Sequence, residues 1–187
     1  MQTKKYLKNL AAFLRGLCLT AGWAVVPGKH VGKNVRVFLS ASIEADSGAS
    51  ITIGKGSKIR ERSVISVRKG GELILGNNVS VGMDNKIAVH ERVVIGDGTL
   101  LSPNVLIYDH NHVFDFEEGV KRKDFYTKPV LIGRNCWIGA NSVILSGTVI
   151  GDYCLIGAGS VVSGEIPSRS KVIQKRSNTM KGKQQAE

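Results

Sequence analysis

The chain has 187 residues, of which 26 are lysine or arginine and 15 are aspartate or glutamate, so its net charge at pH 7 is +11. This length fits a single domain with short appendages. The positive charge is concentrated at the two ends: residues 1–36 contain seven basic residues and no acid, residues 168–187 carry a net charge of +5, and the residues between them are close to neutral. A nucleic-acid-binding protein spreads basic residues over its body or mixes them with aromatic residues, so this distribution argues against nucleic acid as a partner.

Residues 3–20 have the pattern of an amphipathic helix. Leucines at positions 7, 10, 14 and 17 form one stripe, and the basic residues lie elsewhere around the helix. The apolar run from Leu10 to Val26 is interrupted by Arg15 and is short for a transmembrane span, which needs about 20 residues. Two interpretations stay open, and both can hold at once. The helix caps the first turn of the following domain, or it lies on a membrane surface as a cationic amphipathic helix.

Residues 132–167 repeat with a period of six. Aliphatic residues occupy positions 132, 138, 144, 150, 156 and 162, glycine follows at 133, 139, 151 and 157, and a small residue or cysteine lies at 136, 142, 148, 154 and 160. Neither the helical period of 3.6 nor the strand period of 2 produces this spacing, so it indicates an internal structural repeat. Three hexads make one triangular turn with an aliphatic side chain pointing inward from each side. Several turns must stack, because a single turn cannot bury its apolar surface.

The same phase continues toward the N-terminus. An aliphatic–glycine pair opens a turn at Val31, Ile53, Leu75, Ile95, Ile132 and Ile150, at intervals of 22, 22, 20, 37 and 18 residues. We interpret the interval of 37 residues as one turn with an inserted loop at 113–129, where the hexad pattern is absent. The sequence therefore predicts an all-β protein: a parallel β-helix at residues 31–167, a helical segment at 1–30 before it and a basic tail at 168–187 after it. A β-sandwich of short strands is the alternative, but it gives no reason for the regular phase.

These repeats resemble the left-handed parallel β-helix of the hexapeptide-repeat acyltransferases, over about residues 31–167. The segment from Ile95 to His112 is similar to the sugar O-acetyltransferases of that group, which include the galactoside, maltose and xenobiotic acetyltransferases. Its DHNH sequence resembles transferases that modify surface polysaccharides. The resemblance implies acetyl-CoA as the cosubstrate, a sugar or glycan as the acceptor, no metal, and a homotrimer with its sites between subunits.

The DHNH sequence lies where the regular turns stop, and it holds two of the four histidines of the chain, His110 and His112. An imidazole, with an unperturbed pKa of about 6.5, can take a proton from a hydroxyl near neutral pH. The chain has no GxSxG motif and no cysteine in the setting of a nucleophile. A histidine that acts as general base on a bound acceptor is therefore the simplest mechanism, and a solvated loop residue is the alternative.

The resemblance places the catalytic histidine on His112. It implies that His112 removes the proton from a sugar hydroxyl, which attacks the thioester of acetyl-CoA. Asp109 is predicted to orient an imidazole, and Asn85 or a backbone N–H to stabilise the oxyanion. His110 is two residues from His112; we expect it to point the other way on an extended backbone and assign it a supporting or solvated role near the substrate.

By the same analogy, Asp84, Asn85 and His90 are predicted to line the acceptor pocket, one turn before His112. Their alternative role is turn formation, because Asp and Asn favour tight corners. Tyr126 and its neighbour Phe125 are predicted to stack on a sugar or else to pack the inserted loop.

The resemblance also implies a CoA site near the C-terminal end of the β-helix. Small residues there let the pantetheine arm approach the backbone, and they are Ala140, Ala158, Ser163 and Gly164. Trp137 matches a tryptophan near the reactive centre of the family, with packing at a corner as the alternative. The chain departs from its relatives at Gly164-Glu165 and after Pro167, so Lys175 is predicted either to meet the CoA phosphates or to belong to a free basic tail.

Cys136 and Cys154 are 18 residues apart and so occupy the same position on stacked turns. They form a disulfide or metal pair, or they are small residues that pack at that position. There is no C-x-x-C spacing and hence no zinc signature. A reducing cytoplasm is the default location for such a chain, with the inner face of the membrane as a second place of contact if the N-terminal helix binds there.

Three other functions stay open. In the first, the acceptor of the acetyl group is an antibiotic or an amino sugar. In the second, the chain is a zinc enzyme like the gamma-type carbonic anhydrases, with His90, His110 and His112 as ligands, although that family places the last two histidines five residues apart instead of two. In the third, the β-helix has no catalytic activity, but the interruption at the DHNH sequence argues against this.

Overall fold

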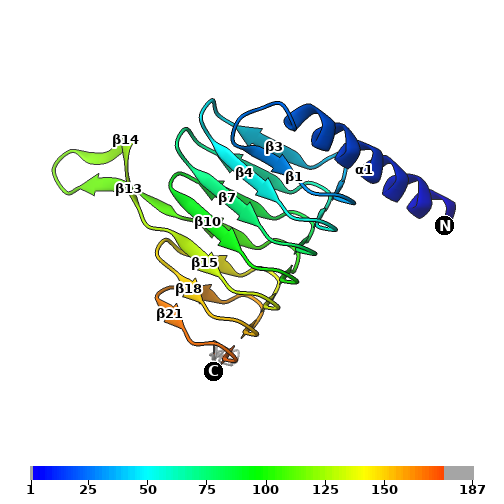
Figure 1. Cartoon of the computed structure of the whole chain (residues 1–187). Helices are drawn as coiled ribbons and strands as arrows, with labels where there is room; N and C mark the ends of the chain where they lie inside the picture. Colours follow the sequence, from blue (N-terminus) through cyan, green and yellow to red (C-terminus); the bar gives the residue numbers. More distant parts are fainter. Residues whose placement is uncertain (1, 175–187) are drawn as a thin grey trace, which may run out of the picture.

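The computed structural model describes the backbone of residues 2–174 and the side chains of residues 6–174. One helix, α1 (Gln2–Trp23), is followed by a column of stacked turns whose short strands form three parallel sheets (Figure 1). The predicted fold class, an all-β parallel β-helix of hexapeptide repeats with an N-terminal helix and one insertion, is confirmed.

Each sheet takes one strand from every complete turn, and the last turn adds a strand to the first and second sheets only. The first sheet contains β1 (Lys29–Val31), β4 (Ser50–Ile53), β7 (Glu72–Leu75), β10 (Arg92–Ile95), β15 (Val130–Ile132), β18 (Val149–Ile150) and β21 (Glu165–Ile166). The second contains β2 (Arg36–Val37), β5 (Lys58–Ile59), β8 (Ser80–Val81), β11 (Leu100–Leu101), β16 (Trp137–Ile138), β19 (Leu155–Ile156) and β22 (Lys171–Val172). The third contains β3 (Ser42–Ala45), β6 (Val64–Val67), β9 (Lys86–Val89), β12 (Leu106–Tyr108), β17 (Val143–Ile144) and β20 (Val161–Val162).

The aliphatic residues that set the period form the core. In the first sheet, Ile53 pairs with Leu75, Leu75 with Ile95, and Ile95 with Ile132, so these side chains stack in one column inside the turns. All four are at most 2% exposed. Burial of one such side chain stabilises a protein by about 1.5–3 kcal/mol, and the repetition of this contact on every turn holds the column together.

The glycine after each aliphatic residue lets the corners of successive turns pack closely on one another. A Cβ atom built on Gly54 would lie 2.4 Å from the carbonyl carbon and oxygen of Gly76 on the next turn. Real Cβ atoms do not approach backbone so closely, so glycine is required here by contact between turns.

The small residue of each hexad links one turn to the next. Thr99 is fully buried; its Oγ1 donates a hydrogen bond to the carbonyl of Gly133 and accepts one from the N–H of Cys136. Cys136 and Cys154 are buried and free, and the Sγ atom of Cys136 lies 3.1 Å from the carbonyl oxygen of Gly151. Burial raises the pKa of the Cys136 thiol. The two cysteines therefore act as small packing residues, and the interpretation as a disulfide is wrong.

Helix α1 packs on β1 and β2 at the N-terminal end of the column (Figure 1). Ala12 is fully buried, and Leu19 and Trp23 pack against the core. The guanidinium of Arg15 donates hydrogen bonds to the carbonyls of Phe38 and Leu39, at 2.6 and 2.8 Å. The helix therefore covers the first turn, as one of the two interpretations expected.

The closest approach between α1 and the first turn depends on Gly16, because a Cβ atom at this position would lie 1.9 Å from the carbonyl oxygen of Val35. We expect Gly16→Ala to destabilise the docked helix by about 1–3 kcal/mol, despite the higher helix propensity of alanine. Gly22→Ala is the matched control, since nothing lies within 4 Å of a Cβ atom there. Hydrogen exchange of the α1 amides and thermal unfolding measure both effects. Equal behaviour of the two variants would contradict the packing argument.

Candidate functional site

The regular turns are interrupted after β12, where the chain forms a β-hairpin that projects from the column (Figure 1). Its strands are β13 (His110–Asp115) and β14 (Gly119–Thr127), and they are antiparallel. His110 pairs with Thr127 and His112 with Phe125, and a register shift follows His112. The insertion is thus an ordered hairpin, and it already includes the two histidines, which the sequence had placed just before the loop.

Three imidazoles gather where the hairpin leaves the column. The ring centroids of His90 and His110 are 3.8 Å apart and the rings are stacked. Phe125 lies 4.3 Å from the His90 ring, 5.4 Å from the His110 ring and 4.6 Å from the His112 ring, measured between centroids. We call these four residues the histidine cluster. Phe125 is its common contact, a role that the sequence alone did not assign.

The expectation that His110 points away from His112 is wrong. Alternate residues of an extended strand lie on the same face, and both rings contact Phe125 of the paired strand. Tyr126, the next residue along β14, is 66% exposed and alternation places it on the other face of the hairpin. The structure therefore brings His110 and His90 to His112 and leaves Tyr126 outside the cluster.

Asp109 is fully buried beneath the cluster. Its Oδ2 atom accepts hydrogen bonds from the N–H groups of Glu91 and Arg92 at 2.7 and 2.8 Å. Its Oδ1 atom accepts one from the N–H of His90 at 2.9 Å and lies 3.1 Å from Nδ1 of His110. Asp109 therefore fixes the corner at residues 90–92 and the ring of His110. The imidazole that it orients is that of His110, and the tautomer that satisfies the contact has its proton on Nδ1 and a free acceptor at Nε2.

His90 and His112 differ in their surroundings. Burial lowers the pKa of His90, and the neighbouring imidazole of His110 lowers it further, so the stacked pair favours a neutral His90 ring. His112 is exposed. Among the described residues none forms a hydrogen bond to its ring nitrogens, so both are accessible to a ligand. His112 therefore has the accessibility that a base acting on an external hydroxyl needs.

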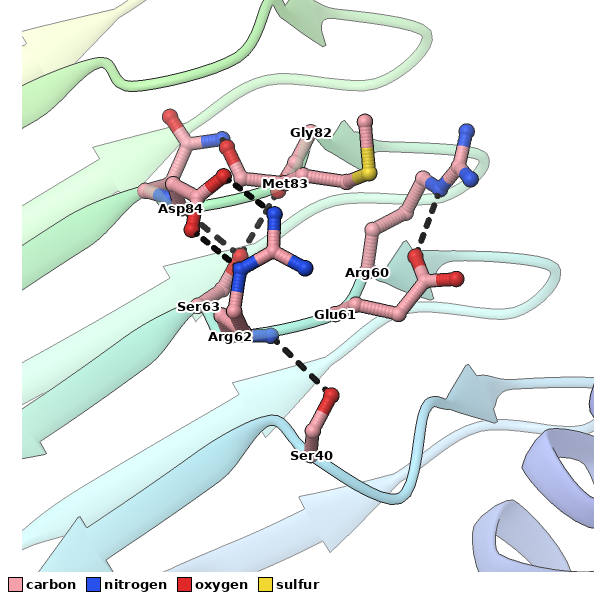
Figure 2. Close-up of polar contacts among 9 residues, drawn as sticks. Ser40, Arg60, Glu61, Arg62, Ser63, Gly82, Met83 and Asp84 are labelled. Carbon is pink, nitrogen blue, oxygen red and sulfur yellow. Dashed lines mark hydrogen bonds and ion pairs between the residues drawn. The ribbon is translucent and has the colours of Figure 1, made fainter.

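Asp84 and Asn85 lie at a different corner, between β8 and β9, and are separated from His90 by the length of β9. The Asp84 carboxylate forms a bidentate ion pair with Nε and Nη2 of Arg62, both at 2.7 Å (Figure 2). The hydrogen bond from Arg62 lowers the pKa of Asp84. The pair is exposed, and Asp84 can still meet a ligand at the surface.

Asn85 has a structural role. Its side chain is fully buried, its Nδ2 group donates to the carbonyl of Ser102 at 3.1 Å, and its Oδ1 atom accepts from the N–H of Val105 at 2.9 Å. Because both ends of the amide are occupied inside the corner, the predictions of an acceptor-binding or oxyanion role for Asn85 are corrected.

The residues predicted to bind CoA fall on two edges of the column. Trp137 is 52% exposed on the second sheet, and its Nε1 donates to Oγ of Ser102 at 2.9 Å. Ala140 and Ala158 lie at the corners that follow this sheet, one turn apart, on the same edge as Asp84. Ser163 and Gly164 follow the third sheet, on the edge of the histidine cluster. Lys175 lies outside the described residues.

Within residues 2–174 there is no group of three or more His, Cys, Asp or Glu side chains arranged to hold a metal ion. Three imidazoles are close to one another, but two of them stack face to face.

The repeat signature described as "Bacterial transferase hexapeptide (six repeats)" matches residues 129–164, which contain β15 to β20. A protein of Mycobacterium tuberculosis described as "Probable acetyltransferase" is 31% identical over 159 residues, which are 83% of this chain and 53% of that protein. The chain belongs to the hexapeptide-repeat transferase family. The match outside the signature includes the turns that carry the histidine cluster.

Two further relatives of this hexapeptide-repeat protein come from Escherichia coli. Galactoside O-acetyltransferase is 38% identical over 98 residues, 52% of this chain and 48% of that enzyme. The protein described as "Putative lipopolysaccharide biosynthesis O-acetyl transferase WbbJ" is 34% identical over 113 residues, 54% of this chain and 55% of its own length. The chain thus spans about half the length of the curated relatives it matches.

The hexapeptide-repeat fold is also similar to a solved structure of AntD, an N-acyltransferase from Bacillus cereus in complex with dTDP and 3-hydroxybutyryl-CoA. The TM-score is 0.65 and the identity 23%, over 74% of each chain. At this identity the similarity shows a shared fold and nothing further.

Proposed function

We propose that the protein is an acetyl-CoA-dependent O-acetyltransferase that transfers an acetyl group to a sugar hydroxyl in surface polysaccharide biosynthesis, with His112 as the general base. The observation that carries the proposal is an exposed imidazole with free ring nitrogens, held on Phe125 where the hairpin leaves the column. The likeness to galactoside O-acetyltransferase and to the lipopolysaccharide O-acetyl transferase supports the reaction and the class of acceptor.

The mechanism is a direct transfer. A nitrogen of His112 accepts the proton of the sugar hydroxyl as the sugar oxygen attacks the thioester carbonyl of acetyl-CoA. The tetrahedral intermediate then expels the CoA thiolate, which accepts the proton from the imidazolium of His112. The products are the acetyl ester and CoA with a free thiol, and no group on the protein becomes acetylated. Backbone N–H groups near the carbonyl oxygen stabilise the oxyanion.

The candidate residues also favour a homotrimer. His90, His110 and His112 lie on the edge after the third sheet, whereas Asp84, Ala140 and Ala158 lie on the edge after the second. A single chain does not join the two edges into one site. In a cyclic trimer, the edge that carries the histidines of one subunit can pack against the edge that carries Asp84 and the two alanines of its neighbour, which completes three equivalent sites. Asp84 then lies at the acceptor, and Ala140 and Ala158 lie beside the pantetheine arm.

Acetyl-CoA is the proposed cosubstrate, and the CoA in the AntD complex supports this choice of donor for the fold. Trp137 extends over the second sheet beside Ser102 and is proposed to border the thioester. Ser163 and Gly164 are proposed contacts on the other edge. With this donor, we propose a cytoplasmic location for the protein.

The direct test is release of CoA thiol from acetyl-CoA by the purified full chain in the presence of sugar acceptors. Neutral glycosides and the matching amino sugars are compared, and mass spectrometry assigns the acetyl group to oxygen or nitrogen. We expect acceptor-dependent thiol release and an O-acetyl ester. Transfer to the amine alone would favour the amino-sugar alternative, and thiol release that no acceptor increases would reject the proposal.

We also propose that α1 contacts an anionic membrane. Its outward face carries Tyr6, Leu7, Leu10, Leu14 and Leu17, which are 47–73% exposed. The helical period puts these side chains opposite Ala12 and Leu19, which face the column. Residues 1–36 include seven basic residues and no acid. An apolar helix face together with this positive charge suits interfacial binding to anionic lipids. Among the helices of the described part of the chain, none has both the length and the apolarity needed to span a bilayer.

A flotation assay tests this contact. The full chain is expected to float with vesicles that contain phosphatidylglycerol and to float much less with pure phosphatidylcholine or at high salt. The triple variant Leu10→Ser, Leu14→Ser, Leu17→Ser is expected to lower vesicle binding by at least about tenfold, because it removes most of the apolar face. Ile173→Ser, which changes a 61% exposed side chain at the other end of the column, is the control. Equal flotation of the triple variant and the control would contradict the proposal.

A further inference from the structure

A cavity of about 360 Å³ lies on the outer surface of the third sheet. Glu44, Ser66, Ala88 and Tyr108 form one column across it, because they are register partners on β3, β6, β9 and β12. Arg68 and Lys86 complete the polar lining. The short side chain of Ala88 lies between Ser66 and Tyr108, which explains the hollow. We call this cavity the third-sheet groove.

Ser66 has an unusual environment in this groove. Its side chain points outward from β6, because the neighbouring Ile65 and Val67 point into the core, yet Ser66 is only 9% exposed. Its Oγ atom is buried and has no hydrogen-bond partner among the described residues. The other buried hydroxyls of the described β-helix are all bonded to a backbone carbonyl. Most of these carbonyls belong to the next turn, as for Ser63 and Thr99, and the Ser160 hydroxyl is bonded within its own corner. Buried polar groups are nearly always paired, so the Ser66 hydroxyl lacks the partner that a ligand bound in the groove would supply.

The groove leads to the histidine cluster. The Tyr108 ring stands edge-on to the His110 ring, with the centroids 6.1 Å apart. Arg68 lies close enough to His90 to lower the pKa of that histidine, after the larger effects of burial and His110. Arg68 follows β6 next to His90, whereas Lys86 begins β9 at the opposite end of the groove. An anionic group held between them over Ala88 therefore leaves the rest of the sugar within reach of Tyr108 and the imidazoles.

The charges of the groove favour an anion. The lining contains two cations, Arg68 and Lys86, and one carboxylate, that of Glu44. Asp46, outside the lining, forms a partly exposed ion pair with Arg68 at 3.7 Å. Guanidinium groups bind carboxylates and phosphates in the same bidentate geometry. The Ser66 hydroxyl adds a donor, and Glu44 adds an acceptor for a sugar hydroxyl.

We propose that the third-sheet groove is the acceptor subsite and that it selects a sugar bearing a negative charge, either a carboxylate or a phosphate. The inference rests on the proposed acetyl transfer for the identity of the reacting hydroxyl, although binding itself does not depend on catalysis. Arg68 and Lys86 pair with the anionic group, Ser66 donates to it, and Tyr108 packs against the sugar ring. The hydroxyl to be acetylated then faces the histidine cluster.

The test uses three matched probes: methyl β-D-glucoside, methyl β-D-glucuronide and α-D-glucose 1-phosphate. Binding to the full chain is followed by protein-observed NMR titration, and acetyl transfer to each probe is measured in parallel. We expect at least one anionic probe to bind about tenfold or more tightly than the neutral glucoside, with shifts at the amides of β6 and β9. The tighter anion identifies the source of the charge as carboxylate or phosphate.

Arg68→Gln and Lys86→Gln are each expected to remove most of this preference for the anion. Lys58→Gln, on the second sheet beside α1, is the control and should retain it. Ser66→Ala is expected to weaken anion binding by about fivefold while raising the melting temperature of the free protein, because it removes an unpaired buried hydroxyl. A role in packing alone would raise the melting temperature and leave binding unchanged.

Equal binding of the neutral and anionic probes, no binding of any of them, or a preference that survives Arg68→Gln and Lys86→Gln would overturn the inference. If the preference follows these residues but no probe is acetylated, the groove stands and the proposed transfer to such sugars is rejected. If the neutral probe is acetylated as efficiently as the anionic ones, the proposed acetyl transfer stands and the selectivity of the groove for anionic sugars is rejected.

Discussion

Replacing His112 with alanine is expected to lower kcat by about two to four orders of magnitude, the range that loss of a general base produces. The ring is exposed, and its only described ring contact is with Phe125 at 4.6 Å. The substitution therefore removes the proton acceptor and leaves the core intact. The melting temperature is expected to stay within about 2 °C of the wild type, since exposed side chains contribute little to stability. Thiol release from acetyl-CoA and thermal unfolding measure the two effects.

His110→Ala is the informative comparison for this prediction. His110 is oriented by a carboxylate and has a free Nε2 atom in the tautomer described above, so it is the strongest competitor for the role of base. We expect His110→Ala to reduce transfer less than His112→Ala and to lower stability more, because it breaks the stack with His90 and leaves Asp109 without one partner. Near-normal transfer by His112→Ala together with loss of transfer in His110→Ala would move the base to His110.

The fold was predictable because one short pattern recurs. A column such as Ile53, Leu75, Ile95 and Ile132 requires the same residue type at the same place on each turn, and that requirement is visible in the sequence. The pairing of Arg62 with Asp84 follows the same logic, because they are 22 residues apart, one turn in this part of the chain. This spacing was the available signal for the ion pair, although charge alone did not reveal it.

The site was predicted less completely, for physical reasons that differ between residues. An asparagine that closes a corner and one that binds a sugar have the same sequence context, so the burial of Asn85 was not visible. The hairpin breaks the repeat, and its pairing of His112 with Phe125 depends on register instead of period. Ser66 reads as an ordinary strand residue, and only its surroundings reveal an unpaired hydroxyl.

Asp109 makes two contributions to the site: it stabilises the corner at residues 90–92, and it orients the ring of His110. Asp109→Ala is expected to lower the free energy of unfolding by about 3–5 kcal/mol, because the N–H groups of residues 90–92 and Nδ1 of His110 lose their acceptor in a buried place. Loss of activity in this variant does not separate the two contributions, since the corner that carries His90 is disturbed as well.

Asp109→Asn separates them. The amide oxygen can replace Oδ2 and keep the N–H groups of His90, Glu91 and Arg92 satisfied, at a cost in stability of about 1–2 kcal/mol. The amide NH₂ group then faces Nδ1 of His110, which must become an acceptor, so the proton moves to Nε2. Imidazole ¹⁵N chemical shifts are expected to report this change of tautomer, and transfer is expected to fall by about tenfold while His112 retains its role. An unchanged tautomer in Asp109→Asn would contradict the assignment of Asp109 as the group that positions His110. A loss of transfer as large as that of His112→Ala, with the tautomer changed, would instead make the His110 ring part of the reaction.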